Sequence, residues 1–262
     1  MTQAPTTPHP GPGRLAGKVI IVTGASQGAG AGCARAVAAE SGSVVLVSRT
    51  AAKLAELAAG LERGGAGVLV HPADVSRPES AGQIAAAAVA AFGRVDGVVN
   101  AAQSPIMRAS RLLTVTDEET DQLWTSGPLA VLRLMRACHP HLKAAGGGSI
   151  VNFVSGAMRR PAGYGMYGAA KSAIETLSRA AASEWGPDQI RVNSVSPAVL
   201  SPSLDLDRDE QQQLLMAQRL PLRRLGRPLE DVGRAVAFLL SDDAAYLTGS
   251  LLLLDGGSWS AG

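Results

Sequence analysis

Short apolar runs recur along the chain and alternate with longer stretches of helical composition. Strands of a parallel sheet that helices cover on both faces are continuous apolar runs, because neither face meets water. A chain of 262 residues is long enough to bury a core of this kind in one domain. We therefore predict an α/β fold, a single-domain doubly wound parallel sheet with helices on both faces. The predicted strands occupy residues 18–22, 44–47, 68–71, 95–100 and 150–154.

The first apolar run leads into a glycine-rich turn, Thr23-Gly24-Ala25-Ser26-Gln27-Gly28-Ala29-Gly30, and then into an alanine-rich helix that ends near Ser41. A helix N-terminus offers unpaired N–H groups and a partial positive charge, which favour a bound phosphate. Glycines let the backbone approach such a ligand closely. The order of strand, turn and helix predicts a site for a dinucleotide diphosphate.

Tyr167 and Lys171 are four residues apart, and Ser155 lies twelve positions before the tyrosine. Four residues are about one helical turn, so a helix presents both side chains on one face. A nearby ammonium is expected to lower the tyrosine pKa from about 10 towards neutrality. A tyrosine with such a pKa can exchange a proton with a carbonyl or an alcohol. The alternative is a chance pair on an ordinary helix.

Together these motifs resemble the short-chain dehydrogenase/reductase family, in particular its 3-oxoacyl reductase and ketoreductase-like members. The resemblance runs from about Leu15 to Trp259 and includes the segments 191–197 and 247–257. It implies a Rossmann-like fold, a nicotinamide cofactor and a catalytic set of Ser155, Tyr167 and Lys171. The cofactor contacts that it implies are Gly24, Ser26, Gln27, Gly28, Ala29, Gly30, Ser48, Arg49, Asp74, Val75, Asn100, Ala101, Ala102, Tyr167, Lys171, Pro197 and Leu200.

The second predicted strand ends in Ser48-Arg49-Thr50 and has no carboxylate there. An acidic residue at this point binds the ribose of NAD, whereas an arginine accommodates the 2′-phosphate of NADP. Arg49 therefore favours NADP(H) as the preferred cofactor, with NAD(H) possible. In the alternative interpretation Arg49 is a solvated loop residue. Gln27 weakens the NADP assignment, because many NADP-binding relatives have a basic residue in that part of the turn.

The chain departs from the family pattern at Gly127, where relatives have a catalytic asparagine that kinks a helix and helps to hold a water for proton transfer to the lysine. Proline within a helix deprives a carbonyl of its partner. We hypothesise that Gly127-Pro128 builds the kink through the backbone and leaves carbonyl groups to hold the water. The alternative is that the relay is lost and the enzyme is slow or inactive.

A second departure affects the substrate side, where Gln103 replaces a glycine of the family pattern. The predicted substrate pocket consists of Gln103, Ser104, Met158 and Tyr164, under a lid at about residues 198–220. We expect a medium-sized, mainly hydrophobic ketone or secondary alcohol. Arg159-Arg160 would also suit an acidic or phosphopantetheine-bearing substrate, although solvated surface charge is the alternative.

Composition excludes several partners. The net charge is only +2, so we predict no nucleic-acid binding. No apolar run approaches the roughly 20 residues of a membrane-spanning helix. Cys33 and Cys138 are predicted to be buried apolar residues of a protein in a reducing compartment. We predict no metal site.

The predicted organisation is a disordered tail at residues 1–14 and a catalytic domain at 15–262. The tail lacks the apolar stretch of a signal peptide, which predicts a cytoplasmic protein. The family resemblance implies a homotetramer or homodimer. Two other functions remain open: a cofactor-binding protein with impaired or no redox activity, and a non-redox epimerase or dehydratase.

Overall fold

In the computed structural model, residues 13–103, 112–159, 162–199 and 217–258 are described. Their centre is one seven-stranded sheet with the order β3-β2-β1-β4-β5-β6-β7, in which every neighbouring pair is parallel. The strands are β1 (Val19–Thr23), β2 (Ser43–Ser48), β3 (Val68–Pro72), β4 (Gly97–Asn100), β5 (Gly148–Phe153), β6 (Ile190–Pro197) and β7 (Leu251–Leu254). The predicted α/β architecture is confirmed, and two strands follow the five that the apolar runs predict.

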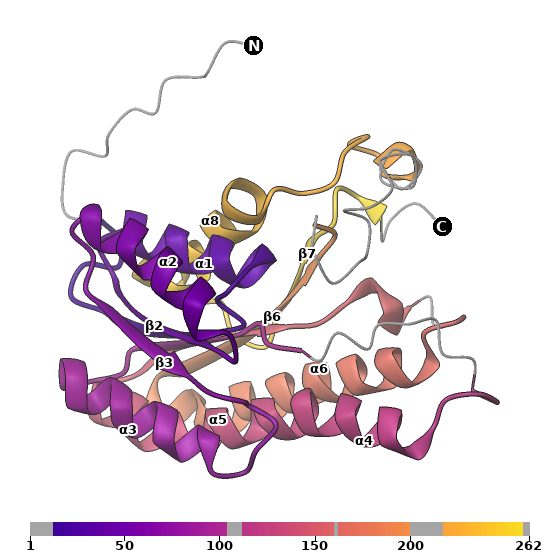
Figure 1. Ribbon diagram of the computed structural model, residues 1–262, viewed down its shortest axis with the longest axis horizontal. Coiled ribbons are helices and arrows are strands. Elements are labelled where there is room, and N and C mark those ends of the chain that lie inside the picture. The colour runs from indigo at the N-terminus through magenta and orange to yellow at the C-terminus, as the bar shows by residue number, and fades with distance from the viewer. Residues whose placement is uncertain (1–12, 104–111, 160–161, 200–216, 259–262) are drawn as a thin grey trace.

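Helices cover both faces of this sheet (Figure 1). On one face lie α1 (Gly28–Ala39), α2 (Ala51–Arg63) and α8 (Arg234–Leu240). On the other lie α3 (Ser80–Phe92), α4 (Asp117–Ser126), α5 (Pro128–Ala144) and α6 (Gly165–Trp185). Short helical turns complete the described segments: η1 (Gly156–Met158), η2 (Gly186–Asp188), η5 (Pro228–Gly233) and η6 (Asp242–Ala244).

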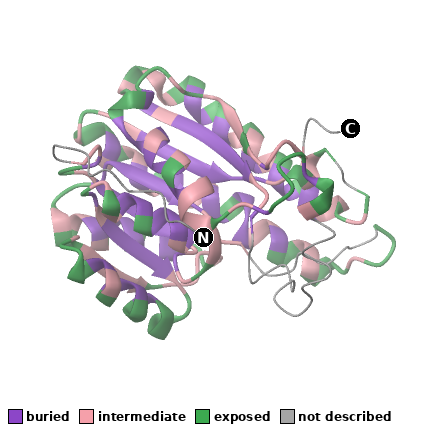
Figure 2. Ribbon diagram, turned by 90° about the horizontal axis from the view of Figure 1, so that it is seen from above, coloured by how far each residue is buried: buried purple, intermediate pink, exposed green. Residues whose placement is uncertain are grey.

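Two hydrophobic cores, one on each face, explain why the strands are apolar without alternation. Ile20 and Val22 of β1 belong to the core under α1, α2 and α8, whereas Val19 and Ile21 belong to the core under α3, α5 and α6. All four side chains are nearly inaccessible to solvent, as the purple strands in Figure 2 show. Burying each such side chain stabilises the fold by about 1.5–3 kcal/mol.

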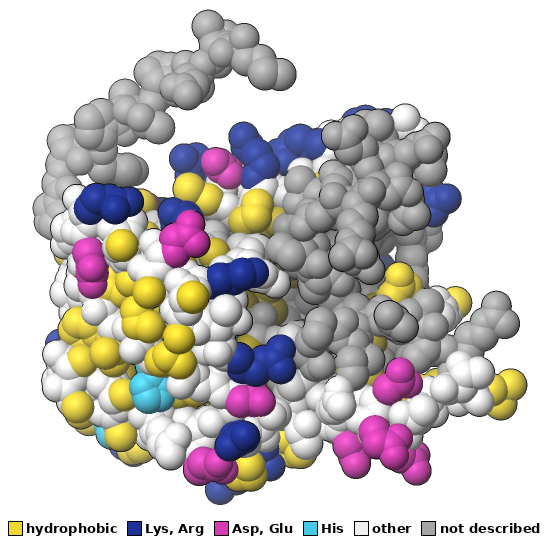
Figure 3. Space-filling model, viewed as in Figure 1, with side chains coloured by type: hydrophobic (Ala, Val, Ile, Leu, Met, Phe, Trp, Pro, Cys, Tyr) yellow, Lys and Arg dark blue, Asp and Glu magenta, His cyan; other side chains and the backbone are white. Residues whose placement is uncertain are grey.

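The predicted helix around Gly127 is broken into two. Thr116 opens α4 with a capping box, in which its hydroxyl accepts from the Glu119 N–H and the Glu119 carboxylate accepts from the Thr116 N–H. The acidic first turn of α4 lies in the region of the magenta group at the lower right of Figure 3. Gly127 has φ −102° and ψ −105°, and Pro128 is the first residue of α5. The backbone thus turns here, as the Gly-Pro pair predicts.

Parts of two predicted segments fall outside the described residues. Residues 1–12 of the predicted tail lie outside the described residues. Arg14, at the end of that tail, forms an ion pair with Glu40 at 2.6 Å, and Leu15 after it is fully buried. Of the predicted lid, only 198–199 and 217–220 are described. Val199 forms an isolated parallel bridge with Gly226. Within the described ranges, no helix is long and apolar enough to cross a membrane.

Candidate active site

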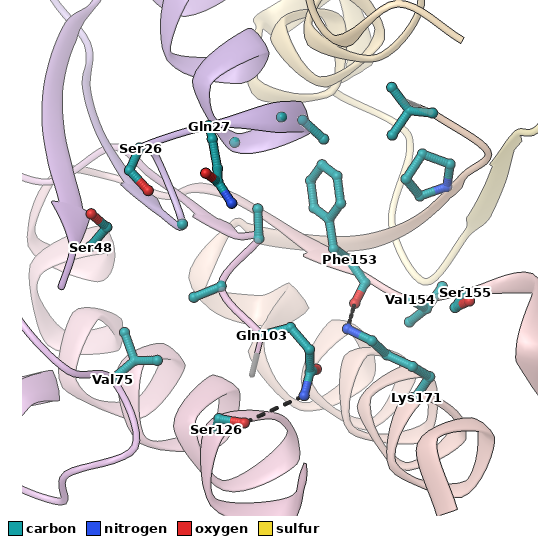
Figure 4. A pocket seen from close by; sticks show the side chains of 18 of the residues that line it. Ser26, Gln27, Ser48, Val75, Gln103, Ser126, Phe153, Val154, Ser155 and Lys171 are labelled. Carbon is teal, nitrogen blue, oxygen red and sulfur yellow. Dashed lines mark hydrogen bonds between the residues drawn. The ribbon is translucent and has the colours of Figure 1, made fainter. Parts of the chain in front are cut away.

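A cavity of about 780 Å³ lies at the carboxyl ends of the central strands. Its walls come from the segments that follow β1, β2, β3, β4, β5 and β6, together with the ends of α4 and the first turns of α6. The carboxyl ends of parallel strands meet at one edge of a sheet, and ligands of open α/β folds bind there. The cavity therefore collects residues from segments that are far apart in the sequence (Figure 4).

The glycine-rich turn forms the floor at the N-terminus of α1. Gln27 is the N-cap residue but makes no side-chain capping bond, so no side chain of the cap occupies the first N–H groups of the helix. Gly24 has a φ of +70°, which glycine adopts without strain. A Cβ at Gly30 would lie 2.2 Å from the Gly24 carbonyl oxygen, so only glycine permits this close approach. These features fit a dinucleotide diphosphate.

Two cations lie at the end of the cavity that β2 borders. Arg49 lines it directly after the strand. Lys53, in the first turn of α2, does not line the cavity itself but donates a hydrogen bond of 3.0 Å to the side-chain oxygen of Gln27, which does. Sequence reasoning missed Lys53, because its contact with Gln27 joins segments that are 26 residues apart. The amide of Gln27 thus has a basic neighbour from another segment.

Asp74 is the one carboxylate among the described lining residues. Its side chain accepts hydrogen bonds from the Ser76 N–H at 3.0 Å and from the Ser76 hydroxyl at 2.7 Å. Burial acts to raise the pKa of Asp74, but these hydrogen bonds and the charges of Arg49 and Arg77 lower it below its usual value. The carboxylate is therefore ionised at neutral pH and is held by Ser76.

Ser155, Tyr167 and Lys171 all line the other end of the cavity. Ser155 follows β5, and its hydroxyl accepts from the Ala157 N–H at 3.2 Å. Tyr167 lies in the first turn of α6 and is 6% exposed. The Lys171 ammonium donates to the Phe153 carbonyl at 3.0 Å and lies 5.7 Å from the centre of the Tyr167 ring. The fold thus brings the three predicted catalytic residues to one place.

The predicted direction of the Tyr167 pKa is wrong for the protein without a ligand. Burial raises the pKa of Tyr167, a hydrogen bond with Ser155 lowers it, and Tyr164 raises it again, with a net increase. Burial also lowers the pKa of Lys171 to about 8. Because the ammonium points to a backbone carbonyl and both groups are desolvated, the loss of water outweighs the attraction on which the sequence prediction relied.

Most of the predicted cofactor contacts line the cavity. They are Gly24, Ser26, Gln27, Gly28, Ala29, Gly30, Ser48, Arg49, Asp74, Val75, Ala101, Ala102, Tyr167, Lys171 and Pro197. Asn100 does not line the cavity. Its side-chain amide donates to the Asn152 side-chain oxygen at 2.8 Å, and the Asn152 amide donates to the Ser178 hydroxyl at 2.8 Å. At the end of a pleated strand the side chain of Asn100 points to the buried side.

Of the residues predicted to form the substrate pocket, some line the cavity and others do not. Gln103 lines the cavity, whereas Met158 and Tyr164 do not. Met158 packs against the core under α3, α5 and α6, and Tyr164 is 38% exposed at the N-cap of α6. Ser104 and Leu200 lie outside the described residues. Lining residues that sequence reasoning did not assign to the site are Thr50, Ala73, Ser76, Gln122, Thr125, Ser126, Phe153, Val154, Gly156, Ala157, Ala198, Val199 and Leu225.

Across the described part of the chain, no group of three or more His, Cys, Asp or Glu side chains is placed to hold a metal ion. Cys33 and Cys138 are both buried and free, and burial raises the pKa of each thiol, to about 12 for Cys138. Neither cysteine lines the cavity. Of the described side chains, the titratable ones that line the cavity near Ser155 are therefore Tyr167 and Lys171.

The sequence of the chain matches a family model and known relatives over nearly its whole length. A family model described as enoyl-(acyl carrier protein) reductase matches residues 24–258. Dehydrogenase/reductase SDR family member 4 of Oryctolagus cuniculus is 34% identical over 248 residues, which cover 93% of this chain and 94% of the relative.

Two solved structures have nearly the same fold. L-sorbose reductase from Gluconobacter frateurii, complexed with NADPH and L-sorbose, has a TM-score of 0.88 and 31% identity, and the match covers 95% of this chain and 98% of that one. A 7α-hydroxysteroid dehydrogenase, complexed with NADH and 7-oxo glycochenodeoxycholic acid, has a TM-score of 0.87 and 27% identity over 93% and 95% of the two chains.

Proposed function

Because the chain belongs to the short-chain dehydrogenase/reductase family of NAD(P)-dependent oxidoreductases, we propose that it transfers a hydride between NADP(H) and a ketone or secondary alcohol. The observation that carries this proposal is the meeting of Ser155, Tyr167 and Lys171 in the cavity that also contains the glycine-rich turn. Tyr167 is the proposed general acid and base.

The roles of the three residues follow from their chemistry. When bound, the nicotinamide supplies the hydride for reduction or accepts it for oxidation. The Ser155 hydroxyl donates a hydrogen bond to the substrate oxygen and stabilises the negative charge that develops there. Tyr167 is protonated at neutral pH because burial raises its pKa, so it can give a proton to that oxygen. The positive charge of Lys171 favours the phenolate that remains.

Replacing Tyr167 by Phe tests this assignment. The ring and its packing are kept, but the proton donor is lost, so we expect kcat to fall by about 10²–10⁴-fold. Binding of NADPH, followed by nicotinamide fluorescence, is expected to stay within about twofold of the wild-type affinity, since no charge changes. A variant that reduces ketones at nearly the wild-type rate would contradict the role of Tyr167.

The same assay separates the alternative functions. A wild-type protein that binds NADPH but reduces no ketone in a broad screen would favour the cofactor-binding protein without redox activity. Product formation without net change in nicotinamide absorbance would favour the epimerase or dehydratase. The intact set of Ser155, Tyr167 and Lys171 supports catalysis over a cofactor-binding protein without redox activity, whereas an epimerase or dehydratase would use the same three residues.

Two features support NADP(H) as the preferred cofactor. Arg49 and Lys53 place two positive charges beside the end of β2, where a 2′-phosphate would lie. Asp74, the carboxylate of the described lining, is held by Ser76 and does not occupy the end of β2. NAD(H) remains the alternative, and the two structural relatives were solved one with NADPH and one with NADH.

Removing the positive charges of Arg49 and Lys53 tests the preference for NADP(H) over NAD(H). Each charge-assisted contact to a phosphate stabilises binding by about 1.5–3 kcal/mol when buried, and less at an exposed site. We expect Arg49→Gln to weaken NADPH binding by about tenfold and Lys53→Gln by a smaller factor, with NADH binding nearly unchanged in both. Fluorescence titration with each nucleotide gives the affinities.

The matched control is Arg63→Gln, which removes the same charge from the far end of α2, away from the cavity lining. Its affinities for both nucleotides should equal those of the wild type. Equal affinities of the wild-type protein for NADH and NADPH would refute the NADP preference, whatever the variants show.

The proposal extends to the class of substrate and to the oligomeric state. A medium-sized ketone or secondary alcohol suits the cavity, whose described wall beside Tyr167 also offers polar side chains from Gln103, Thr125 and Ser126. We infer a homotetramer or homodimer from the family resemblance, and a cytoplasmic location from the lack of a signal-peptide pattern in residues 1–14. Helices α4, α5 and α6 would form its interface.

A further inference from the structure

The side chain of Gln103 projects into the cavity with an oxygen that no described residue satisfies. Its Nε2 faces the Ser126 hydroxyl at 3.4 Å, and its Oε1 is buried and accepts no hydrogen bond from the described side chains or backbone (Figure 4). A buried acceptor without a donor costs about 1–3 kcal/mol. A donor inside the cavity is therefore expected to reach this oxygen.

The orientation of the amide follows from Ser126. The Ser126 hydroxyl donates to the Gln122 carbonyl at 2.6 Å, so its oxygen can only accept from Gln103. The group of Gln103 that faces Ser126 is therefore the NH₂, because a carbonyl there would oppose a second acceptor. This leaves Oε1 as an acceptor on the other side of the amide.

Gly127 provides the space for this side chain. A Cβ at position 127 would lie 3.3 Å from Oε1 and 3.5 Å from Nε2 of Gln103. The amide of Gln103 thus lies over the Cα of Gly127, in the volume that a side chain at 127 would need. The two departures from the family pattern are complementary in space, although 24 positions separate them.

Lys171 needs the acceptor that Gln103 offers. An ammonium has three donors, and among the described residues the Phe153 carbonyl is the one acceptor of Lys171. Lys171 is 4% exposed and lines the same cavity as Gln103. Glu175, four residues further along α6, makes no ion pair with it in the described part of the chain. A water that accepts from the ammonium and donates to Oε1 would satisfy both groups.

We propose that Gln103 and Lys171 hold such a water between them, which makes Gln103 a positioning residue for proton delivery in place of a side chain at position 127. For each proton that Tyr167 gives to the substrate oxygen, one proton enters from solvent through this water and Lys171 and restores the phenol. The role of this water in proton delivery rests on the proposed function. The binding of a water between Gln103 and Lys171 does not depend on it.

The pKa of Lys171 in the protein without cofactor tests the water site. The chain has four lysines, Lys18, Lys53, Lys143 and Lys171, so selective labelling gives a simple NMR spectrum, and a Lys171→Met variant identifies the signal by subtraction. Gln103→Leu removes the acceptor and should lower the pKa of Lys171 by about half a unit or more. Gln103→Glu keeps the shape, adds charge and should raise it.

Gln122→Leu is the matched control, because Gln122 lines the same cavity on the exposed side of α4 and should leave the pKa of Lys171 unchanged. If Gln103→Leu fails to fold, the nearly isosteric Gln103→Glu still decides the question. A Lys171 pKa that neither substitution at Gln103 moves would overturn the inference.

A kinetic measurement then tests proton delivery. Gln103→Leu should lower kcat by about tenfold and raise the solvent deuterium isotope effect, while the KM for NADPH stays unchanged. An unchanged kcat and isotope effect would refute the positioning role. Absence of turnover in the wild type with every ketone would instead contradict the proposed function, and the NMR result would still decide whether the water site exists.

Discussion

Lys171 shows how burial changes the chemistry of a single residue. Its ammonium is desolvated and has a pKa of about 8, while burial raises the pKa of Tyr167. A bound cofactor that offers acceptors to the ammonium would favour its charged form, which in turn favours the phenolate. The sequence spacing predicts that the two residues are neighbours, but the direction of each pKa shift depends on what surrounds them.

The lowered pKa of Lys171 predicts a pH dependence of stability. Below pH 8 the lysine is protonated in both the folded and the unfolded chain. Between pH 8 and about 10.4 only the unfolded chain keeps the proton, so the folded state becomes more stable as the pH rises. This contribution amounts to at most about 1.4 kcal/mol per pH unit.

Urea unfolding of the wild type and of Lys171→Met at pH 7.5, 9 and 10 measures this contribution. The difference in unfolding free energy should shift in favour of the wild type as the pH rises. Cys33 and Cys138, whose raised pKa values have the opposite effect above pH 9, are common to both proteins and cancel. Unfolding curves that change in parallel with pH would show that Lys171 is not perturbed.

At the scale of the elements, the break between α4 and α5 is the most consequential local feature. The pair Gly127-Pro128 in the sequence predicts a break in the helix, because proline disrupts a helix and glycine tolerates unusual backbone angles. The sequence does not predict that the Gln103 amide lies over this break. That contact depends on how the loop after β4 meets the end of α4.

Alanine at Gly127 tests how tightly the break is built. Its Cβ would lie 2.6 Å from the Leu123 carbonyl oxygen as well as close to Gln103, so the backbone must shift. We expect Gly127→Ala to destabilise the protein by about 1–3 kcal/mol in urea unfolding. Asparagine, the residue of the family pattern, meets the same contacts and should not increase turnover.

Gly60→Ala is the matched comparison in the interior of α2. A Cβ there has one neighbour, at 4.0 Å, on the flexible end of Arg63. Because alanine favours helix over glycine, this variant should be more stable by about 1 kcal/mol. Similar effects of both substitutions would show that the contacts at position 127 are easily relieved.

At the scale of the whole molecule, the parallel sheet creates the site. Six of its strands, β1 to β6, end at or lead into segments that line the cavity, so residues as far apart in the sequence as Gly24 and Leu225 line one site. Helices on both faces bury the central strands of the sheet. Most of the proposed cofactor-binding side chains therefore lie on loops at the strand ends, whereas Tyr167 and Lys171 lie on α6, and the sheet holds both in position.

The sequence by itself determined the class of fold and the position of the glycine-rich turn, and it predicted the set Ser155, Tyr167 and Lys171 that the structure brings together. These are properties of local pattern: apolar runs, glycines at a strand end and a spacing of one helical turn depend on residues close together in the chain. Only the tertiary structure decided that Asn100 turns away from the cavity, that Lys53 reaches Gln27 and that Gln103 lies over Gly127. Such contacts, and the desolvation that sets the pKa values of Tyr167 and Lys171, arise where distant segments pack together, and no local pattern encodes them.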